Sequence, residues 1–220
     1  MQHILIIGGM GPQASVYAHK RILDIAHERY ALHNNDYPRI THLSVNVPDF
    51  IADDTRKFEA LFQLKDAISE ISVESVSEGF IACNTAHMLY DDLAKLVGRE
   101  KLYSIVDETS RHIETLRTPS VKIGLLATPS TIQAELYKVD ILPTPEQQDV
   151  IESCIRGLIS NESPRKLYRR LLPVLDDFQR KGATHILLGC TELSILYDIL
   201  ASRYHLIDPV DIIIRKIMRL

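Results

Sequence analysis

The stretch "EGFIACNTAH", residues 78–87, decides the fold of this chain because it joins a short apolar run directly to a thiol and then to polar residues. The run 79–83 predicts a buried strand, and Asn84 and Thr85 interrupt it where a helix could begin. In open parallel sheets, ligands gather at the carboxyl ends of the strands. The stretch therefore predicts that Cys83 lies at a strand end where a ligand could bind.

The second half of the chain repeats this order of elements. Its first strand and loop, "KIGLLATPS" at 122–130, correspond to "ILIIGGMGP" at 4–12, and "ILLGCTEL" at 186–193 places Cys190 and Thr191 where the first half has Cys83 and Thr85. Identity between the halves is low, so the repeat rests on element order. We expect an α/β protein with two similar Rossmann-like α/β/α lobes, parallel sheets, pseudo-twofold symmetry and an active site in the cleft between the lobes.

Short runs rich in Ile, Val and Leu alternate with longer segments of helical period, which indicates parallel strands joined by helical crossovers. The first lobe is expected to cover residues 1–100 and the second 101–206. Strands are predicted at 3–7, 42–47, 79–83, 102–106, 121–127, 138–142, 185–189 and 206–207. Helices are predicted at 55–78, with Phe58 and Phe62 on its apolar face, at 146–160, and at 164–181, which Pro173 should kink or divide.

Composition limits the classes of function. The 220 residues are 45% hydrophobic and 25% charged, with a net charge of −4, which suits a globular protein with no basic surface for nucleic acid. The apolar run 4–7 is too short for a signal peptide or a membrane span, so we expect a cytoplasmic protein with no membrane partner. The three cysteines have no zinc-site spacing, so no metal is predicted and free thiols are expected.

Two thiols at equivalent strand ends suggest acid/base chemistry. The free N–H groups and dipole of a following helix favour the thiolate, so both positions favour reactivity. If the lobes face each other, a small substrate between them meets Cys83 on one side and Cys190 on the other. Such a pair suits a 1,1-proton transfer, in which one thiolate removes a proton and the other thiol returns one to the opposite face. Packing is the alternative use of a free cysteine, and it is the use predicted for Cys154, which lies on an apolar helical stripe.

The polar residues around the thiols are candidates for substrate binding. Backbone N–H groups of the loop "GGMGP", 8–12, could hold a carboxylate or phosphate, whereas its GGxG pattern matches a dinucleotide site only weakly, so no cofactor is predicted. The loop "ATPST", 127–131, offers hydroxyl donors. Thr85 and Thr191 could equally be helix N-caps, and His87 is expected at the surface or in a cap. Asn84, Thr85, Thr191 and Glu192 flank the thiols and are candidates for orienting a substrate's carboxylate and amino group, with Thr128 as a further hydroxyl donor.

These residues resemble the aspartate/glutamate racemase family. The matching motifs occur in family order over nearly the whole chain, and they are "GGMGP" (8–12), "VPD" (47–49), "ACNTAH" (82–87), "GLLAT" (124–128), "GCTEL" (189–193) and "LIDP" (206–209). The resemblance implies cofactor-independent racemisation of an amino acid, with Cys83 and Cys190 as the acid/base pair. It also implies substrate contacts from Met10, Gly11 and Asp49, a segment 207–220 that packs back onto the first lobe, and a homodimer.

The sequence departs from the aspartate racemase pattern at two positions where the family commonly has a basic residue. Phe50 stands where aspartate racemases commonly have the Arg that grips the substrate's side-chain carboxylate, and Arg56 is the nearest basic candidate. The family also often has a Lys near the end of the helix that contains "ESCIRGLIS", and Arg156, about one turn earlier, could replace it. The sequence therefore leaves the amino-acid substrate open. The alternatives are a related hydantoin-type racemase or maleate-type isomerase, and a small-molecule-binding protein without turnover.

Overall fold

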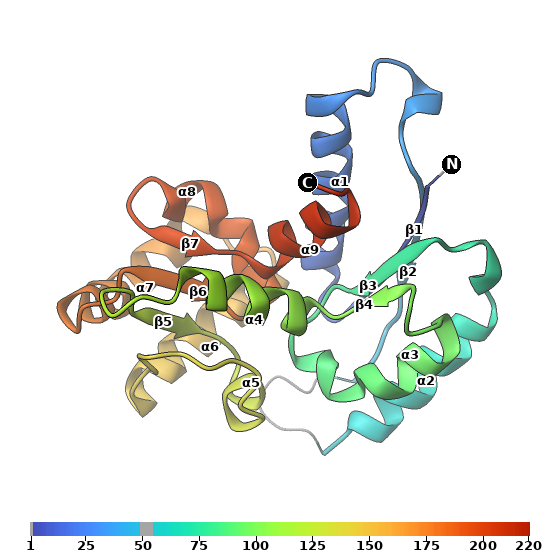
Figure 1. Ribbon diagram of the computed structural model, residues 1–220. Coiled ribbons are helices and arrows are strands. Elements are labelled where there is room, and N and C mark those ends of the chain that lie inside the picture. Colours follow the sequence, from blue (N-terminus) through green and yellow to red (C-terminus); the bar gives the residue numbers. More distant parts are fainter. Residues whose placement is uncertain (1, 49–54) are drawn as a thin grey trace.

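A computed structural model describes residues 2–48 and 55–220, and its strands form two parallel sheets (Figure 1). The first has the order β2-β1-β3-β4 and the second the order β5-β6-β7. The strands of the first sheet are β1 (His3–Gly8), β2 (Arg39–Ser44), β3 (Glu78–Ile81) and β4 (Leu102–Tyr103), and those of the second are β5 (Ile123–Leu126), β6 (His185–Leu188) and β7 (His205–Ile207). The α/β class with two parallel sheets is confirmed.

Helices cover both faces of the first sheet because the residues of its central strand alternate in direction. Ile4 and Ile6 of β1 pack with α1 (Pro12–Arg29) and α9 (Pro209–Ile217), whereas Leu5 and Ile7 pack with α2 (Lys57–Ser69) and α3 (Tyr90–Val97). All four strand residues are fully buried. The result is a three-layer arrangement of helices, sheet and helices.

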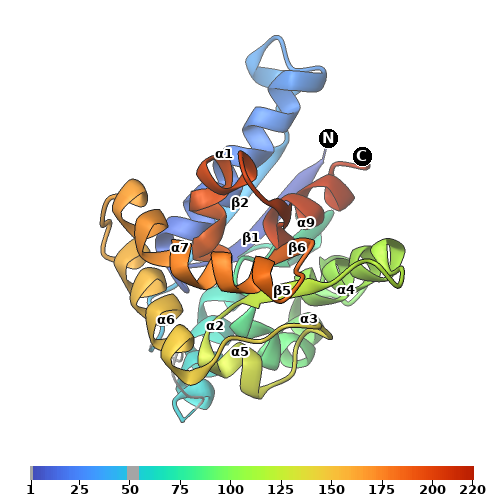
Figure 2. The ribbon, with the colours of Figure 1, turned by 90° about the vertical axis from the view of Figure 1, so that its left-hand side faces the viewer.

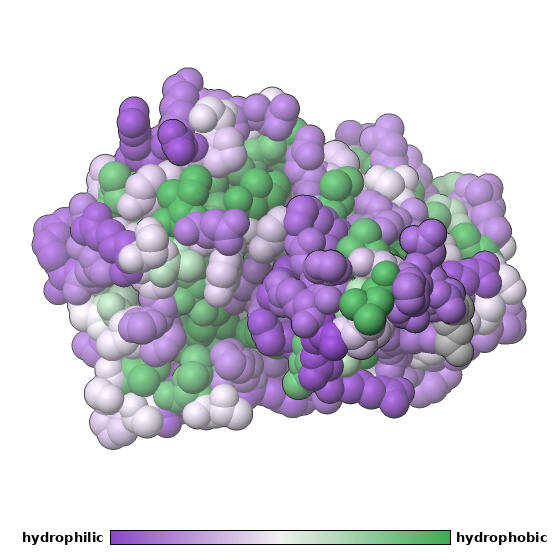
Figure 3. All heavy atoms as spheres, turned by 90° about the horizontal axis from the view of Figure 1, so that it is seen from above, coloured by the Kyte–Doolittle hydropathy of each residue, from purple (hydrophilic) through white to green (hydrophobic). Residues whose placement is uncertain are grey.

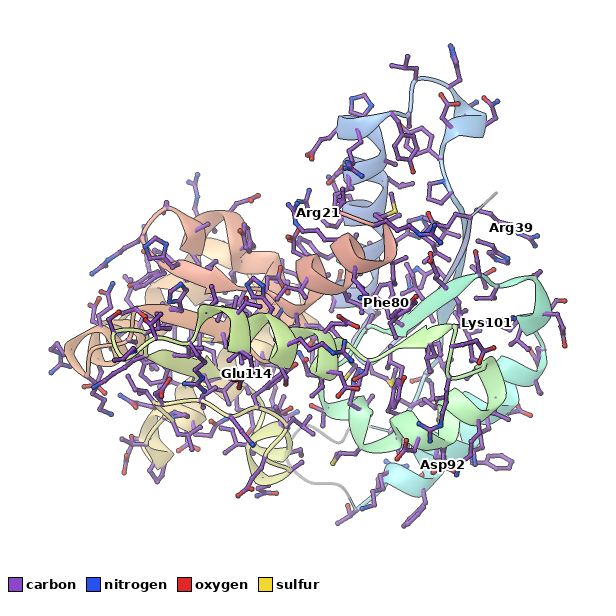
Figure 4. All side chains as sticks on the ribbon, in the orientation of Figure 1. Arg21, Arg39, Phe80, Asp92, Lys101 and Glu114 are labelled. Carbon is purple, nitrogen blue, oxygen red and sulfur yellow. The ribbon has the colours of Figure 1, made fainter. Side chains whose placement is uncertain are left out.

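The last helix of the chain shares the core of the first sheet. Its residues Val210, Ile213 and Ile214 are buried in the same cluster as Phe80 of β3. On the outer side, Asp211 of α9 accepts from the Arg21 guanidinium of α1, with Nη2 and Oδ1 2.8 Å apart (Figure 4). The two ends of the sequence therefore lie side by side.

The second sheet is also covered on both faces. Leu126, Ile186 and Leu188 face α6 (Pro145–Ile159) and α7 (Pro164–Arg180), whereas Leu125 and Leu187 face α4 (Ile105–Leu116). Figure 2 shows α6 and α7 running together along one side of the molecule, and α4 also contacts α9. The shorter helices are α5 (Pro129–Gln133) and α8 (Tyr197–Ala201), with 3-10 turns η1 (Asn34–Asp36), η2 (Val73–Ser75), η3 (Thr85–Leu89) and η4 (Thr191–Leu196).

Three strand predictions differ from the structure by three residues or more. The strand predicted at 102–106 ends at Tyr103, and α4 begins at Ile105. The second strand begins and ends three residues earlier than predicted, at Arg39 and Ser44. The strand predicted at 138–142 is reduced to one parallel bridge between Ile141 and Gly124 of β5. This bridge lies on the outer edge of β5, as β2 lies on the edge of β1. The second half thus keeps the strand order of the first, with its edge strand shortened.

Two helix predictions are corrected as well. The segment 164–181 is not divided at Pro173, because the proline lies on the exposed side of α7 while Leu171, Val174 and Leu175 anchor the same helix in the core. A missing N–H is tolerated where the unpaired carbonyl can meet water. The helix predicted at 55–78 is shorter, since α2 ends at Ser69. Its predicted apolar face is wrong at Phe58 and Phe62, which are 73% and 72% exposed, whereas Ile68 is buried in the core as predicted.

The surface in Figure 3 is mostly hydrophilic, with hydrophobic residues in separate groups between the polar ones. Within residues 2–48 and 55–220, none of the helices is both long and apolar enough for a membrane span.

Two leucines of α3 give a matched test of the packing between α3 and the first sheet. Leu93 is fully buried and Leu96 is 42% exposed, so we expect Leu93→Ala to lower the free energy of unfolding by about 2–5 kcal/mol, through lost burial and a cavity. Leu96→Ala should cost less than about 1 kcal/mol, since it changes the surface. Urea unfolding followed by circular dichroism measures both. Equal losses in the two variants would contradict the packing described for α3.

Candidate active site

The two cysteines of the sequence repeat stand at equivalent places on the two sheets. Cys83 lies two residues beyond the end of β3, and Cys190 lies two residues beyond the end of β6. Each is followed by a 3-10 turn, η3 or η4, that begins with Thr85 or Thr191. Both thiols line one cavity of about 310 Å³ where the carboxyl ends of the two sheets meet.

Most of the residues predicted from the sequence surround this cavity. The structure places the following at its wall: Met10, Gly11, Cys83, Asn84, Thr85, Thr128, Cys190, Thr191 and Glu192. Asp49 and Phe50 lie outside the described residues. Arg56 is not in the described wall of the cavity; it precedes α2 and binds Glu59 at 2.9 Å, with its side chain 58% exposed. Pro12, Val47, Pro48 and Ile159 form an apolar part of the wall. The first three lie in the motifs "GGMGP" and "VPD", but the sequence did not predict any of the four as binding residues.

Both thiols are only 6% exposed, and this burial governs their protonation. Burial raises the pKa of Cys83 to about 12, the charge of Glu192 adds to the rise, and the backbone N–H groups of Ala86 and Thr85 oppose it. The pKa of Cys190 is likewise raised by burial and by Glu192. The turns that follow the cysteines supply backbone N–H groups that lower the thiol pKa, as expected at the start of a helix. Desolvation of the thiolate raises the pKa by more than these N–H groups lower it. In the unliganded cavity both groups are thiols at neutral pH.

Glu192 connects the loop after β1, which contains Gly11, to the thiol of Cys190. It is 2% exposed; its Oε1 accepts from the Gly11 N–H at 2.7 Å, and its Oε2 accepts from the Cys190 thiol at 3.0 Å. A Cβ added at Gly11 would lie 2.9 Å from Oε1, so glycine permits this close approach. Burial raises the pKa of Glu192. An acceptor with a raised pKa, in contact with a thiol, is suited to exchange a proton with it.

Hydroxyl groups bind one another across the junction of the two halves. The Thr85 hydroxyl lies 3.0 Å from those of Thr128 and Thr131, and the Thr191 hydroxyl donates to the Ala82 carbonyl at 3.2 Å. Thr128 caps α5 by accepting from the Thr131 N–H at 3.1 Å, whereas Thr85 and Thr191 are not caps. Their hydroxyls instead join the two strand ends of the site.

Two residues behind the wall hold the first thiol's turn. Tyr137, which follows α5, donates a hydrogen bond from its hydroxyl to Asn84 Oδ1. The sequence did not predict Tyr137 as a site residue, because the strand predicted at 138–142 gave no reason to place Tyr137 near the thiols. His87 is half-buried, not at the surface; its Nδ1 contacts the Cys83 carbonyl at 2.9 Å and its Nε2 accepts from the Ile105 N–H at 3.0 Å. Burial lowers the pKa of His87 to about 4, so the ring is neutral and fixes the backbone at Cys83.

Arg156 of α6 lies in the wall of the cavity, where the sequence offered it as the replacement for a family lysine. Its Nε donates to Glu152 Oε1 at 2.8 Å, and its side chain is 45% exposed, so it occupies the solvent side of the site. The described residues contain no group of three or more His, Cys, Asp or Glu side chains arranged to hold a metal ion.

Residues 7–217 match the family model described as Asp/Glu/Hydantoin racemase. The broad specificity amino-acid racemase RacX of Bacillus subtilis is 26% identical over 215 residues, which are 92% of this chain and 91% of that protein.

Solved structures show the same fold. The aspartate racemase of Picrophilus torridus superimposes with a TM-score of 0.82 at 21% identity, covering 100% of this chain and 94% of that one. An aspartate racemase homologue from Pyrococcus horikoshii gives a TM-score of 0.74 at 23% identity, covering 100% and 98%. The resemblance noted in the sequence is confirmed, and the chain belongs to the Asp/Glu/hydantoin racemase family, a family of isomerases.

Proposed function

We propose that this protein is a cofactor-independent amino-acid racemase that uses Cys83 and Cys190 as the two acid/base groups. The observation that carries the proposal is the pair of buried thiols, at equivalent strand ends, in the wall of a single cavity. Inversion at a carbon requires a base on one face and an acid on the other, and two thiols can exchange these roles between the two directions of reaction. The similarity to a broad specificity amino-acid racemase supports the same class of substrate.

In the proposed reaction, one cysteine, as thiolate, removes the α-proton and the other, as thiol, delivers a proton to the opposite face. The intermediate carbanion lies beside the substrate carboxylate, so donors must stabilise its charge. Asn84, Thr85 and Thr128 line the cavity with amide and hydroxyl groups that can donate to that carboxylate. The Thr191 hydroxyl already donates to the Ala82 carbonyl.

Each turnover leaves the thiolate on the opposite cysteine, so the resting protonation must be restored before the same enantiomer reacts again. Glu192 is suited to this step because its Oε2 already accepts a hydrogen bond from Cys190. The Glu192 carboxylate takes the Cys190 proton to form the thiolate. After turnover Cys190 holds the α-proton of the substrate and Cys83 is the thiolate, so solvent protonates Cys83 while Glu192 releases its proton to solvent. Cys83 has His87 at its backbone carbonyl, and this neutral ring positions the residue without exchanging its thiol proton.

The identity of the amino acid depends on the outer part of the cavity. Met10, Val47, Pro48 and Ile159 are apolar, while Arg156 supplies a cation at the solvent side. We propose that α-amino acids with short or medium side chains fit this mixed wall, and that Arg156 favours those with a side-chain carboxylate. From the sequence we keep the prediction of a homodimer, which the mass of the protein in solution tests.

The first experiment follows the α-proton directly. Purified protein is mixed in D₂O with L- and D-amino acids, including aspartate, glutamate and alanine, and loss of the α-proton signal is followed by NMR beside chiral chromatography. Racemisation with matching exchange supports the proposal. Ligand-induced thermal stabilisation without exchange of any substrate would favour a binding protein that lacks turnover.

Substitution of the thiols tests the mechanism. Cys83→Ser and Cys190→Ser should each lower racemisation at least about 100-fold in both directions, since the hydroxyl is a much weaker acid and the reaction needs both groups. Cys154→Ser is the matched control, because Cys154 is buried between α6 and α7 and does not line the cavity. Retention of normal turnover by either of the first two variants, with the control active, would contradict the two-thiol mechanism.

The raised thiol pKa values predict the pH profile. The reaction needs one thiolate, and both groups are protonated near pH 7 because burial raises the pKa of each. The thiolate fraction, and with it kcat/KM, should therefore increase by up to about tenfold per pH unit from pH 6 to 8. Measurements with circular dichroism of the substrate at constant ionic strength give the slope. A profile that falls over this range would contradict the assignment of a thiolate base.

The role of Arg156 is tested by substrate preference. Arg156→Leu should raise KM for aspartate or glutamate by up to about fivefold and leave KM for alanine nearly unchanged, because a half-exposed ion pair contributes up to about 1 kcal/mol. Arg99→Leu is the control, since Arg99 is similarly exposed, is paired with Asp91 at 2.7 Å and lies away from the cavity. If Arg56→Leu changed the acidic-substrate KM and Arg156→Leu did not, the cation would be the one first predicted from sequence.

A further inference from the structure

The side-chain amide of Asn84 is only half satisfied. Asn84 is 1% exposed and lines the cavity, and its Oδ1 accepts from the Tyr137 hydroxyl. Its Nδ2, also buried, has no hydrogen-bond partner among the described residues. A buried donor without a partner is unfavourable, and buried polar groups in folded proteins nearly always find one. A substrate bound in the cavity can supply that partner.

The position of Tyr137 determines which end of the amide faces the substrate. Tyr137 is 7% exposed, packs against Ile113 and Leu125 beneath the second sheet, and is not in the described wall of the cavity. The phenol holds Oδ1 on its own side, so Nδ2 is the end left for the cavity. Burial raises the pKa of Tyr137 far above its usual value, so the hydroxyl keeps its proton over the working pH range.

We propose that Tyr137 is a positioning residue of the racemase, which locks the Asn84 amide with Nδ2 as the donor to the substrate carboxylate. The contact crosses from the segment after α5 to the turn after β3, so the second half of the chain orients a binding group of the first. The role of the substrate carboxylate rests on the proposed function, whereas the orientation of the amide does not.

Without the Tyr137 hydroxyl, the Asn84 amide would be free to rotate about the side-chain torsion χ2. An amide turned by 180° presents Oδ1 to the carboxylate, and two acceptors repel each other. Binding should therefore weaken while the thiols, which Tyr137 does not contact through a hydrogen bond, keep their chemistry. A KM effect much larger than the kcat effect distinguishes this role from general damage to the site.

Tyr137→Phe, which removes only the oxygen, is expected to raise KM about tenfold and to lower kcat less than about threefold. Tyr204→Phe is the matched control, because Tyr204 is 6% exposed and its hydroxyl has no partner within hydrogen-bond geometry among the described residues. In the Asn84→Ala background the change at Tyr137 should alter KM by less than about twofold, since the coupled partner is gone. A full additional tenfold rise in that background would overturn the proposal.

A second measurement does not depend on turnover. In ligand-free protein labelled with ¹⁵N, the side-chain amide protons of Asn84 are identified by their loss in Asn84→Ala. In Tyr137→Phe these signals should shift or broaden as the amide becomes mobile, and in Tyr204→Phe they should stay in place. Unchanged Asn84 signals in Tyr137→Phe would overturn the proposal. If the wild-type protein racemised nothing while these signals still shifted, the proposed function would fail and the positioning by Tyr137 would stand.

Discussion

The site depends on one constraint, which is that polar groups buried where the two sheets meet must find partners. Several of these groups find them in the opposite half of the chain. The Gly11 N–H binds Glu192, the Thr85 hydroxyl binds that of Thr128, and the Thr191 hydroxyl binds the carbonyl of Ala82. Because an unpaired buried group is costly, each bond restrains the relative position of the two strand ends. The spacing of the thiols across the cavity follows from these bonds.

This constraint also explains why burial, and not the backbone N–H groups of the following turn, determines the protonation of the two cysteines. A site closed by contacts between the halves excludes water from both thiols, and the exclusion disfavours the thiolate. The same exclusion strengthens every donor that faces a developing negative charge. In the proposed reaction, protonated resting thiols and stabilisation of the carbanion would both follow from this exclusion of water.

The sequence was sufficient for the fold class because its apolar runs are short and spaced by helical segments, which only parallel sheets with crossovers accommodate. It located the thiols and most of the wall because these follow directly from strand ends. It failed where tertiary packing decides. Pro173 was expected to divide a helix that the core holds together on its other side, and Phe58 was expected inside although it is exposed. Tyr137 was missed because it reaches Asn84 from a segment distant in sequence, and local patterns carry no record of such a contact.

The packing of α9 has a consequence for how the protein is made. The core on one face of the first sheet contains Ile4 and Ile6 from the start of the chain and Ile213 and Ile214 from its end. A ribosome releases residues 4 and 6 long before residues 213 and 214, so this core stays incomplete until residues 213 and 214 have been made. The second sheet, whose strands and main covering helices lie between residues 105 and 207, can assemble before that moment. One face of the first sheet is therefore completed only after the residues of the second sheet have been made, although the strands of the first sheet come earlier in the sequence.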